Sequence, residues 1–216
     1  MVKEVTLSIP TSYGDISLKK WLEFQKELKN YEGDEAAITA LMFFHLCGLE
    51  PAYLKGLSID DYAMIKSQLE LFLTNTDLPL QRIIRIDGIE YGFEPNLSTM
   101  TYGAYADITS FKELTIDENW AKVMSILYRP LIRKKGEMYS IESYKGEMDA
   151  DKFLEVGMDI HFGALFFFVN LSTDLLKGIL NSTMEMDIPH NYKPILERSG
   201  QLIQRLLNSP AETLQK

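Results

Sequence analysis

Residues 159–180 read DIHFGALFFFVNLSTDLLKGIL, with three consecutive phenylalanines near the middle. At helical spacing, apolar side chains cover most of the circumference, and the polar strip is narrow: it consists of Asn170, Asp174, Lys177 and Asn181. A helix of this kind lies at the centre of a domain or is shared with a second protein. The stretch therefore predicts a core helix first and a subunit interface second.

A membrane-spanning helix is the third interpretation of this stretch. A span needs about 20 predominantly apolar residues, whereas only 162–169 form a run without a strongly polar side chain. Asp174 and Lys177 would each cost about 2.5–3.5 kcal/mol near the centre of a bilayer. We therefore expect no membrane association.

The apolar part of the helix circumference is wider than a single neighbouring element could cover. We expect Phe166 to be fully buried in its own chain. Phe167 and Phe168 are then the candidate contacts with another subunit.

The rest of the chain reads mostly as helices. Four residues of types that favour the N-cap precede apolar side chains at helical spacing: Ser17, Asp34, Ser58 and Thr101. A very regular helix is expected from residue 117 to 129, with Arg129 complementing its negative end and Pro130 terminating it.

Residues 82–93, RIIRIDGIEYGF, predict a β-hairpin. Two runs rich in isoleucine and aromatic residues flank Asp87-Gly88, a dipeptide that favours a two-residue turn with positive φ at both positions. Residues 130–148 are the least periodic part, and we expect an extended arm there with a strand in MYSIESY. The fold class is then mainly α with a small β component, in a single helical domain over 1–216.

Composition supports a globular protein. Of the 216 residues, 46% are hydrophobic and 25% charged, both ordinary values for a folded domain. The net charge of −9 argues against a general nucleic-acid binder, because such proteins neutralise phosphates with Lys and Arg. The single cysteine, Cys47, excludes an internal disulfide and reads as a small buried hydrophobe. No signal peptide is visible, so we expect a cytoplasmic location.

No catalytic, cofactor or metal motif is present. The chain has no phosphate-binding glycine loop and no nucleophile elbow. The three histidines, His45, His161 and His190, are too far apart for a zinc site, and the first two read as core histidines with satisfied hydrogen bonds. We therefore predict no catalytic residue, no cofactor and no metal.

One basic cluster stands out in the acidic chain: Arg129, Arg133, Lys134 and Lys135. It is either the charge-compensated end of a helix or an attachment patch for an acidic partner or a nucleic-acid backbone. Both interpretations stay open at this point.

The order of several segments resembles an uncharacterised family of tailed-bacteriophage structural and assembly proteins, found in crAss-like phages of Bacteroidetes and in marine phages. The resemblance covers about residues 5–180, and its segments are IPTSYGDISLKKWLEFQKEL, IDGIEYGFEPNLSTMTYGAYADI, ENWAKVMSILYRPLI and the phenylalanine-rich helix. MSILYRPL after YGAYADI is its most specific piece, and no catalytic residue is carried over with it.

The resemblance implies a virion protein assembled in the host cytoplasm, such as a head-to-tail connector, a ring protein or portal adaptor. Its partners would be portal or tail components and further copies of itself, with passive contact with packaged DNA but no sequence-specific binding. A tail assembly chaperone that leaves before the virion is complete is the alternative. A small enzyme or a host-directed binding module is the second alternative.

Overall fold

The computed structural model describes residues 7–31, 33–75, 77–97, 100–111, 115–146 and 149–185, and over 172–185 it describes only the helical backbone. About 53% of the chain is helical, and the strands form a four-stranded antiparallel sheet. The class is therefore mixed α/β with helices predominant, which confirms the expected excess of helix over strand.

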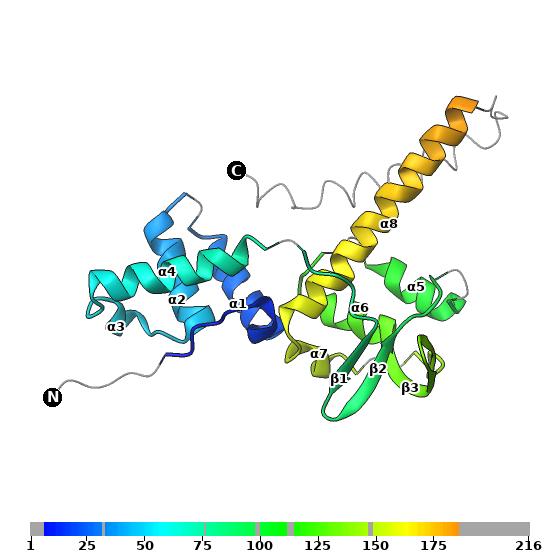
Figure 1. Cartoon of the computed structure of the whole chain (residues 1–216), viewed down its shortest axis with the longest axis horizontal. Helices are drawn as coiled ribbons and strands as arrows, with labels where there is room; N and C mark the ends of the chain where they lie inside the picture. Colours follow the sequence, from blue (N-terminus) through cyan, green and yellow to red (C-terminus); the bar gives the residue numbers. More distant parts are fainter. Residues whose placement is uncertain are drawn as a thin grey trace.

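Four helices follow a short 3-10 turn, η1 (Tyr13–Asp15), and gather at one end of the molecule (Figure 1). They are α1 (Leu18–Leu28), α2 (Glu35–Cys47), α3 (Pro51–Leu54) and α4 (Ile59–Leu73). The predicted N-caps are confirmed, because each accepts a hydrogen bond from a backbone N–H in the first turn of its helix: Ser17, Asp34 and Ser58 here, and Thr101 before α5 (Tyr102–Ser110).

The sheet has the order β1-β2-β3-β4. Its strands are β1 (Ile83–Ile86), β2 (Ile89–Phe93), β3 (Tyr128–Lys135) and β4 (Met138–Ile141). The predicted hairpin is confirmed: β1 pairs with β2, and the turn has φ of 50° at Asp87 and 81° at Gly88. Residues 130–141 of the expected arm thus belong to the sheet, and the strand expected in MYSIESY is found over 138–141.

The outer hairpin curls over one face of β2. A Cβ added at Gly92 would lie 2.7 Å from both Ile141 Cγ2 and Tyr139 Cε2, so only glycine permits this approach. The Tyr139 hydroxyl donates to the carbonyl of Phe93 at 2.7 Å across the same contact. The sheet is therefore strongly curved rather than flat.

The helix expected from 117 to 129 is wrong at both ends, since α6 covers only Trp120–Leu127. The chain passes from α6 directly into β3, where Tyr128 pairs with Phe93 and Arg129 with Gly92. Sheet pairing takes the backbone out of the helix two residues before Pro130 could do so. Arg129 therefore does not complement a helix end.

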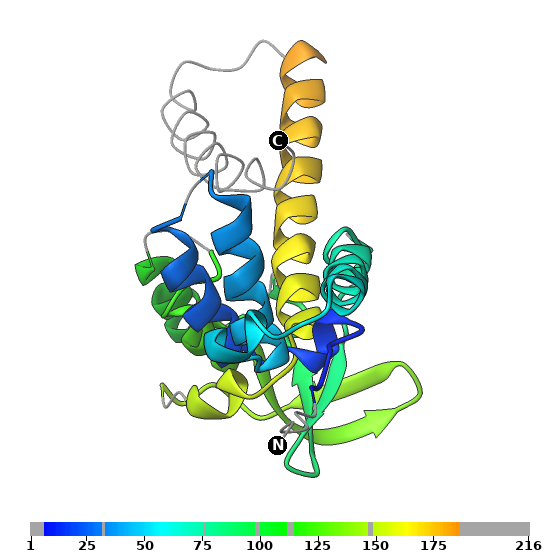
Figure 2. The same cartoon turned by 90° about the vertical axis from the view of Figure 1, so that its left-hand side faces the viewer.

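The two remaining helices are α7 (Asp151–Leu154) and α8 (Met158–Glu185). At 1.5 Å per residue, the 28 residues of α8 extend about 42 Å. The first half of α8 lies between the N-terminal helices and the sheet, and the second half projects beyond the body (Figures 1 and 2). A Cβ at Gly163 would lie 2.6 Å from the carbonyl oxygen of Pro79, so this glycine lets the connection before β1 cross α8 closely.

Aromatic contacts join α8 to both sides of the molecule. The Tyr13 ring lies 4.9 Å from Phe162 of α8 and 5.4 Å from Phe72 of α4. On the sheet side, Phe93 lies 5.4 Å from Phe167. The first half of α8 is therefore a core helix, as the sequence predicts, and its start is where the helical part meets the sheet.

Candidate interaction surface

The predicted contact residues fall in two places. Phe167 and Phe168 lie on the middle of α8, and the four basic residues all lie on β3. The structure does not bring the two sets together as one exposed site, because the phenylalanines pack on the core side of the sheet.

All three phenylalanines of the triplet are partly buried. Phe167 and Phe168 both contact Phe93, with ring centroids 5.4 and 6.1 Å away. The prediction that Phe166 is fully buried is wrong: it stacks on Phe162 at 5.8 Å but keeps part of its surface exposed. Among the described residues its ring contact is with Phe162 in the preceding turn of α8, whereas the next two phenylalanines face the sheet at Phe93.

Arg129 differs from the other three residues of the basic cluster because its side chain is almost completely buried. Its Nη2 group donates to the carboxylate of Glu94, and the two side chains are only 11% and 9% exposed. Two other donors of the guanidinium, Nε and Nη1, have no hydrogen-bond partner among the described residues. Arg129 is therefore a structural ion-pair partner, with Glu94 as its compensating charge.

The other three cations, Arg133, Lys134 and Lys135, are exposed. Ile132 and Met138 on the same hairpin are 66% and 73% exposed. We call residues 132–138 the hairpin tip; its turn contains Gly136 with φ of 60°. None of its three cations forms an ion pair with another described residue, and Glu137 is its one acidic side chain, so the tip carries a net positive charge beside apolar surface.

Two explanations of the hairpin tip can be compared. Lysine on a strand edge commonly protects the sheet from pairing with other chains, and residues 131–135 of β3, which carry the cations, pair with β4 but not with β2. That protective function explains the charges. It does not explain the exposure of Ile132 and Met138, which favours a surface that contacts a partner.

A second exposed surface, on α4, was missed by the sequence reasoning. The inward stripe of this helix was recognised from Ile65, Leu69 and Phe72, which are buried. Met64 and Leu71 lie off that stripe, and they are 55% and 77% exposed. Their spacing of seven residues, which places both on one face, is the signal that could have identified this surface.

Cys47 is buried as predicted, whereas the prediction of core histidines with satisfied hydrogen bonds holds only in part: His45 is half-buried, and His45 Nε2 and His161 Nδ1 have no hydrogen-bond partner among the described residues. His161 is completely buried, with Nε2 3.1 Å from the carbonyl oxygen of Phe153, and burial lowers its pKa to about 4. His45 places Nε2 3.3 Å from a carboxylate oxygen of Glu27. Cys47 is buried, which raises its pKa to about 11. His190 lies outside the described residues.

Two small hollows are present on the described surface. One, of about 200 Å³, lies between Phe93, Leu97 and Phe167. The other, of about 210 Å³, is lined by polar groups that include Tyr144 and Lys152. Within the described residues, no cluster of three or more His, Cys, Asp or Glu side chains has the arrangement of a metal site.

Comparisons with known proteins were made against family models, curated proteins and solved structures, and none of the three produced a match. Over the described part of the chain, no helix combines the length and apolar content of a membrane span.

Proposed function

We propose that this chain is a non-enzymatic bacteriophage virion protein, a ring or adaptor subunit of the head-to-tail connector that acts through protein–protein contacts. The observation that carries the proposal is the hairpin tip, where Ile132 and Met138 are exposed beside three unpaired cations. The similarity of the segment order to tailed-phage proteins supports the same function.

A connector subunit must contact several neighbours at once, and this shape provides elements for that task. The hairpin tip and the second half of α8 both extend from the body (Figures 1 and 2). Isolated charges on such elements steer association more than they strengthen it, whereas the apolar side chains supply contact area. The proposed partners are further copies of the chain and portal or tail proteins.

We further propose that the chain works as a single domain. Tyr13 supports this, because its ring packs on both α4 and α8 and its hydroxyl donates to the carbonyl of Leu73 at 2.9 Å. Motion of the helical part relative to the sheet would break these contacts. Assembly in the host cytoplasm, location in the virion and passive contact with packaged DNA belong to the same proposal.

The test is quantitative mass spectrometry of purified phage particles. A ring or adaptor subunit is expected in a fixed, repeated copy number relative to the portal protein. Absence from particles would exclude the virion function. If the chain then co-purifies from infected cells with one tail protein, it is an assembly chaperone; a concentration-dependent catalytic activity would instead identify an enzyme.

A further inference from the structure

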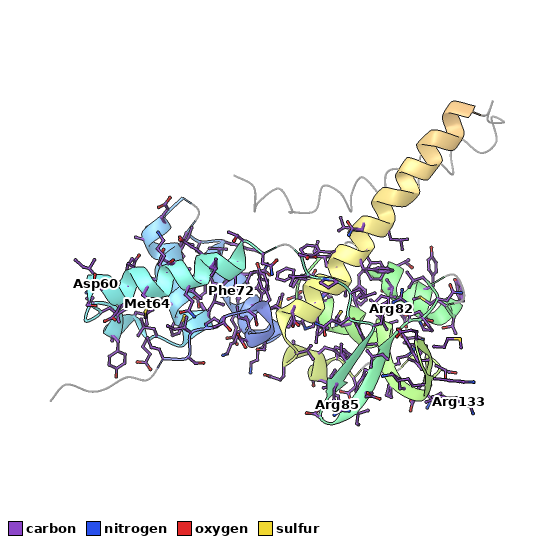
Figure 3. All side chains as sticks on the ribbon, in the orientation of Figure 1. Asp60, Met64, Phe72, Arg82, Arg85 and Arg133 are labelled. Atoms are coloured by element: carbon purple, nitrogen blue, oxygen red, sulfur yellow. The ribbon has the colours of Figure 1, made fainter. Side chains whose placement is uncertain are left out.

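Two exposed apolar surfaces lie far apart along the long axis of the molecule, since α4 runs from one end towards the middle, where Phe72 lies, and the hairpin tip is at the other end (Figure 3). In Figure 3, Asp60 and Met64 of α4 lie at one end, and Arg133 of the hairpin tip lies at the other. A contact between these two surfaces within one chain is therefore excluded by distance. A contact between two copies joins one end of a molecule to the other end of the next.

The exposed face of α4 is apolar with acidic members. Asp60, Met64 and Leu71 follow helical spacing on this face, and Ile59 on the adjoining side of the same helix is 87% exposed. Acidic residues at the start of a helix stabilise it through the helix dipole, and Asp61 does so as the partner of the Ser58 hydroxyl, at 2.7 Å. The dipole does not account for the exposure of three large apolar side chains.

The charges of the two surfaces are opposite. Asp60 has no ion-pair partner within the described residues, and Glu70 on the same helix pairs with half-buried Lys66 at 3.6 Å. The hairpin tip contributes three cations, one acid (Glu137) and two exposed apolar residues in a chain whose net charge is −9. Two copies that each carry a net charge of −9 repel one another. A basic tip lowers this repulsion where it approaches an acidic surface of the second copy.

We propose that the hairpin tip of one copy binds the exposed face of α4 on a second copy. Ile132 and Met138 would contact Met64 and Leu71, and the cations would lie near Asp60. In the proposed arrangement each copy uses its two surfaces on two different neighbours, so the interface is head-to-tail, and such interfaces produce a ring when the rotation between copies closes. This inference rests on the proposed connector function and names the contact that would build the ring.

The first experiment measures the oligomeric state of the full chain by analytical ultracentrifugation. We expect the wild type to self-associate at low salt and to dissociate as salt rises, because exposed charges are screened. The hairpin variant, with Arg133→Glu, Lys134→Glu and Lys135→Glu, should associate at least about tenfold more weakly. The α4 variant, with Asp60→Asn, Met64→Gln and Leu71→Gln, should show the same loss.

Matched controls separate the interface from general effects of charge and apolar area. Reversing two exposed lysines of α1 and the lysine directly after it, with Lys19→Glu, Lys26→Glu and Lys29→Glu, changes the net charge by the same amount as the hairpin variant. Replacing Tyr102 and Tyr105 of α5, which are 83% and 58% exposed, with Gln removes apolar surface elsewhere. Both controls should associate like the wild type. Circular dichroism checks that every variant is folded, which the exposure of all these positions favours.

The second experiment mixes the two interface variants. The hairpin variant keeps an intact α4 face and the α4 variant keeps an intact hairpin tip, so each mixed pair can form one native contact only. We expect a 1:1 heterodimer that grows no further. The wild type distinguishes a head-to-tail contact from a two-fold dimer in which both contacts form reciprocally, because only the head-to-tail contact lets it grow beyond a dimer.

The results distinguish this inference from the proposed function. The inference is overturned if the wild type stays monomeric at about 100 µM and low salt. It is also overturned if both interface variants self-associate as strongly as the wild type. If such a chain is nevertheless found in particles, the virion function stands and its contacts are elsewhere. If copies associate through these surfaces but the chain is absent from particles, the connector function fails and the interface stands.

Discussion

Glu94, directly after β2, and Arg129, near the start of β3, form an ion pair that is almost completely excluded from solvent. The pair links the start of β3 to the end of β2. It also explains why the predicted basic patch contributes three cations to the surface and not four.

Removing one charge of this pair should be costly. Glu94→Gln leaves the guanidinium of Arg129 buried without a compensating charge, and we expect the free energy of unfolding to fall by about 3–5 kcal/mol. Replacing both residues, with Glu94→Leu and Arg129→Met, should cost less than the single change. Urea denaturation measures both, and a loss below about 1 kcal/mol for Glu94→Gln would show that water reaches the pair.

Gly92→Ala should destabilise the sheet. The added methyl group would lie 2.7 Å from Ile141 and Tyr139 and 2.9 Å from Leu131, so β4 must move away. We expect a loss of about 1–3 kcal/mol in the free energy of unfolding. Gly103→Ala on α5 is the matched control, because its new Cβ would meet nothing closer than 3.7 Å; it should be neutral or slightly stabilising. Equal melting temperatures for the two variants would contradict the close packing of β4 on β2.

His161 should make the protein acid-sensitive. Burial lowers its pKa to about 4 in the folded chain, whereas the unfolded value is 6.5. Below pH 6.5 the unfolded chain binds a proton that the folded chain does not, so stability falls as the pH drops from 6.5 towards 4, by up to about 3 kcal/mol. His161→Gln removes this contribution. The difference in unfolding free energy between the two proteins should therefore change with pH in this window; a constant difference would mean that the folded chain admits the charge.

Tyr144 should contribute to alkaline unfolding. Partial burial and the hydrogen bond that its hydroxyl donates to Asp107 raise its pKa to about 12. Between pH 10 and 12 the unfolded chain loses this proton and the folded chain keeps it, so stability falls as the pH rises. Tyr144→Phe should weaken the pH dependence in that range. Absorbance titration of phenolate in both proteins checks the assignment, and a Tyr144 that ionises near pH 10 would contradict it.

Several elements could be predicted from local sequence because local interactions decide them. Ser17, Asp34 and Ser58 each bind a backbone N–H within their own helix. The turn at Asp87-Gly88 needs positive φ at both positions, which this dipeptide tolerates. In each case the two interacting groups are a few residues apart, so the sequence contains both.

The predictions from sequence are wrong where residues far away in the chain determine the secondary structure or the burial of a side chain. Tyr128 and Arg129 continue a helical pattern, but pairing with Phe93 and Gly92 draws them into β3. Phe166 continues the apolar stripe of Phe162, but only the tertiary structure shows that Tyr13 covers Phe162 while Phe166 keeps part of its surface exposed. Helix spacing reports which face is apolar, and it carries no information on where the neighbouring elements stop.

The sequence by itself determined the excess of helix, the caps, the hairpin and a central phenylalanine-rich helix, because hydrophobic periodicity and turn chemistry are local. The tertiary structure alone decided that Arg129 is buried against Glu94 while Arg133 is exposed, and that α4 keeps an uncovered apolar face. The physical reason is that burial depends on what other segments cover. That covering is set by the curl of β3 and β4 over Gly92 and by the place where α8 leaves the body.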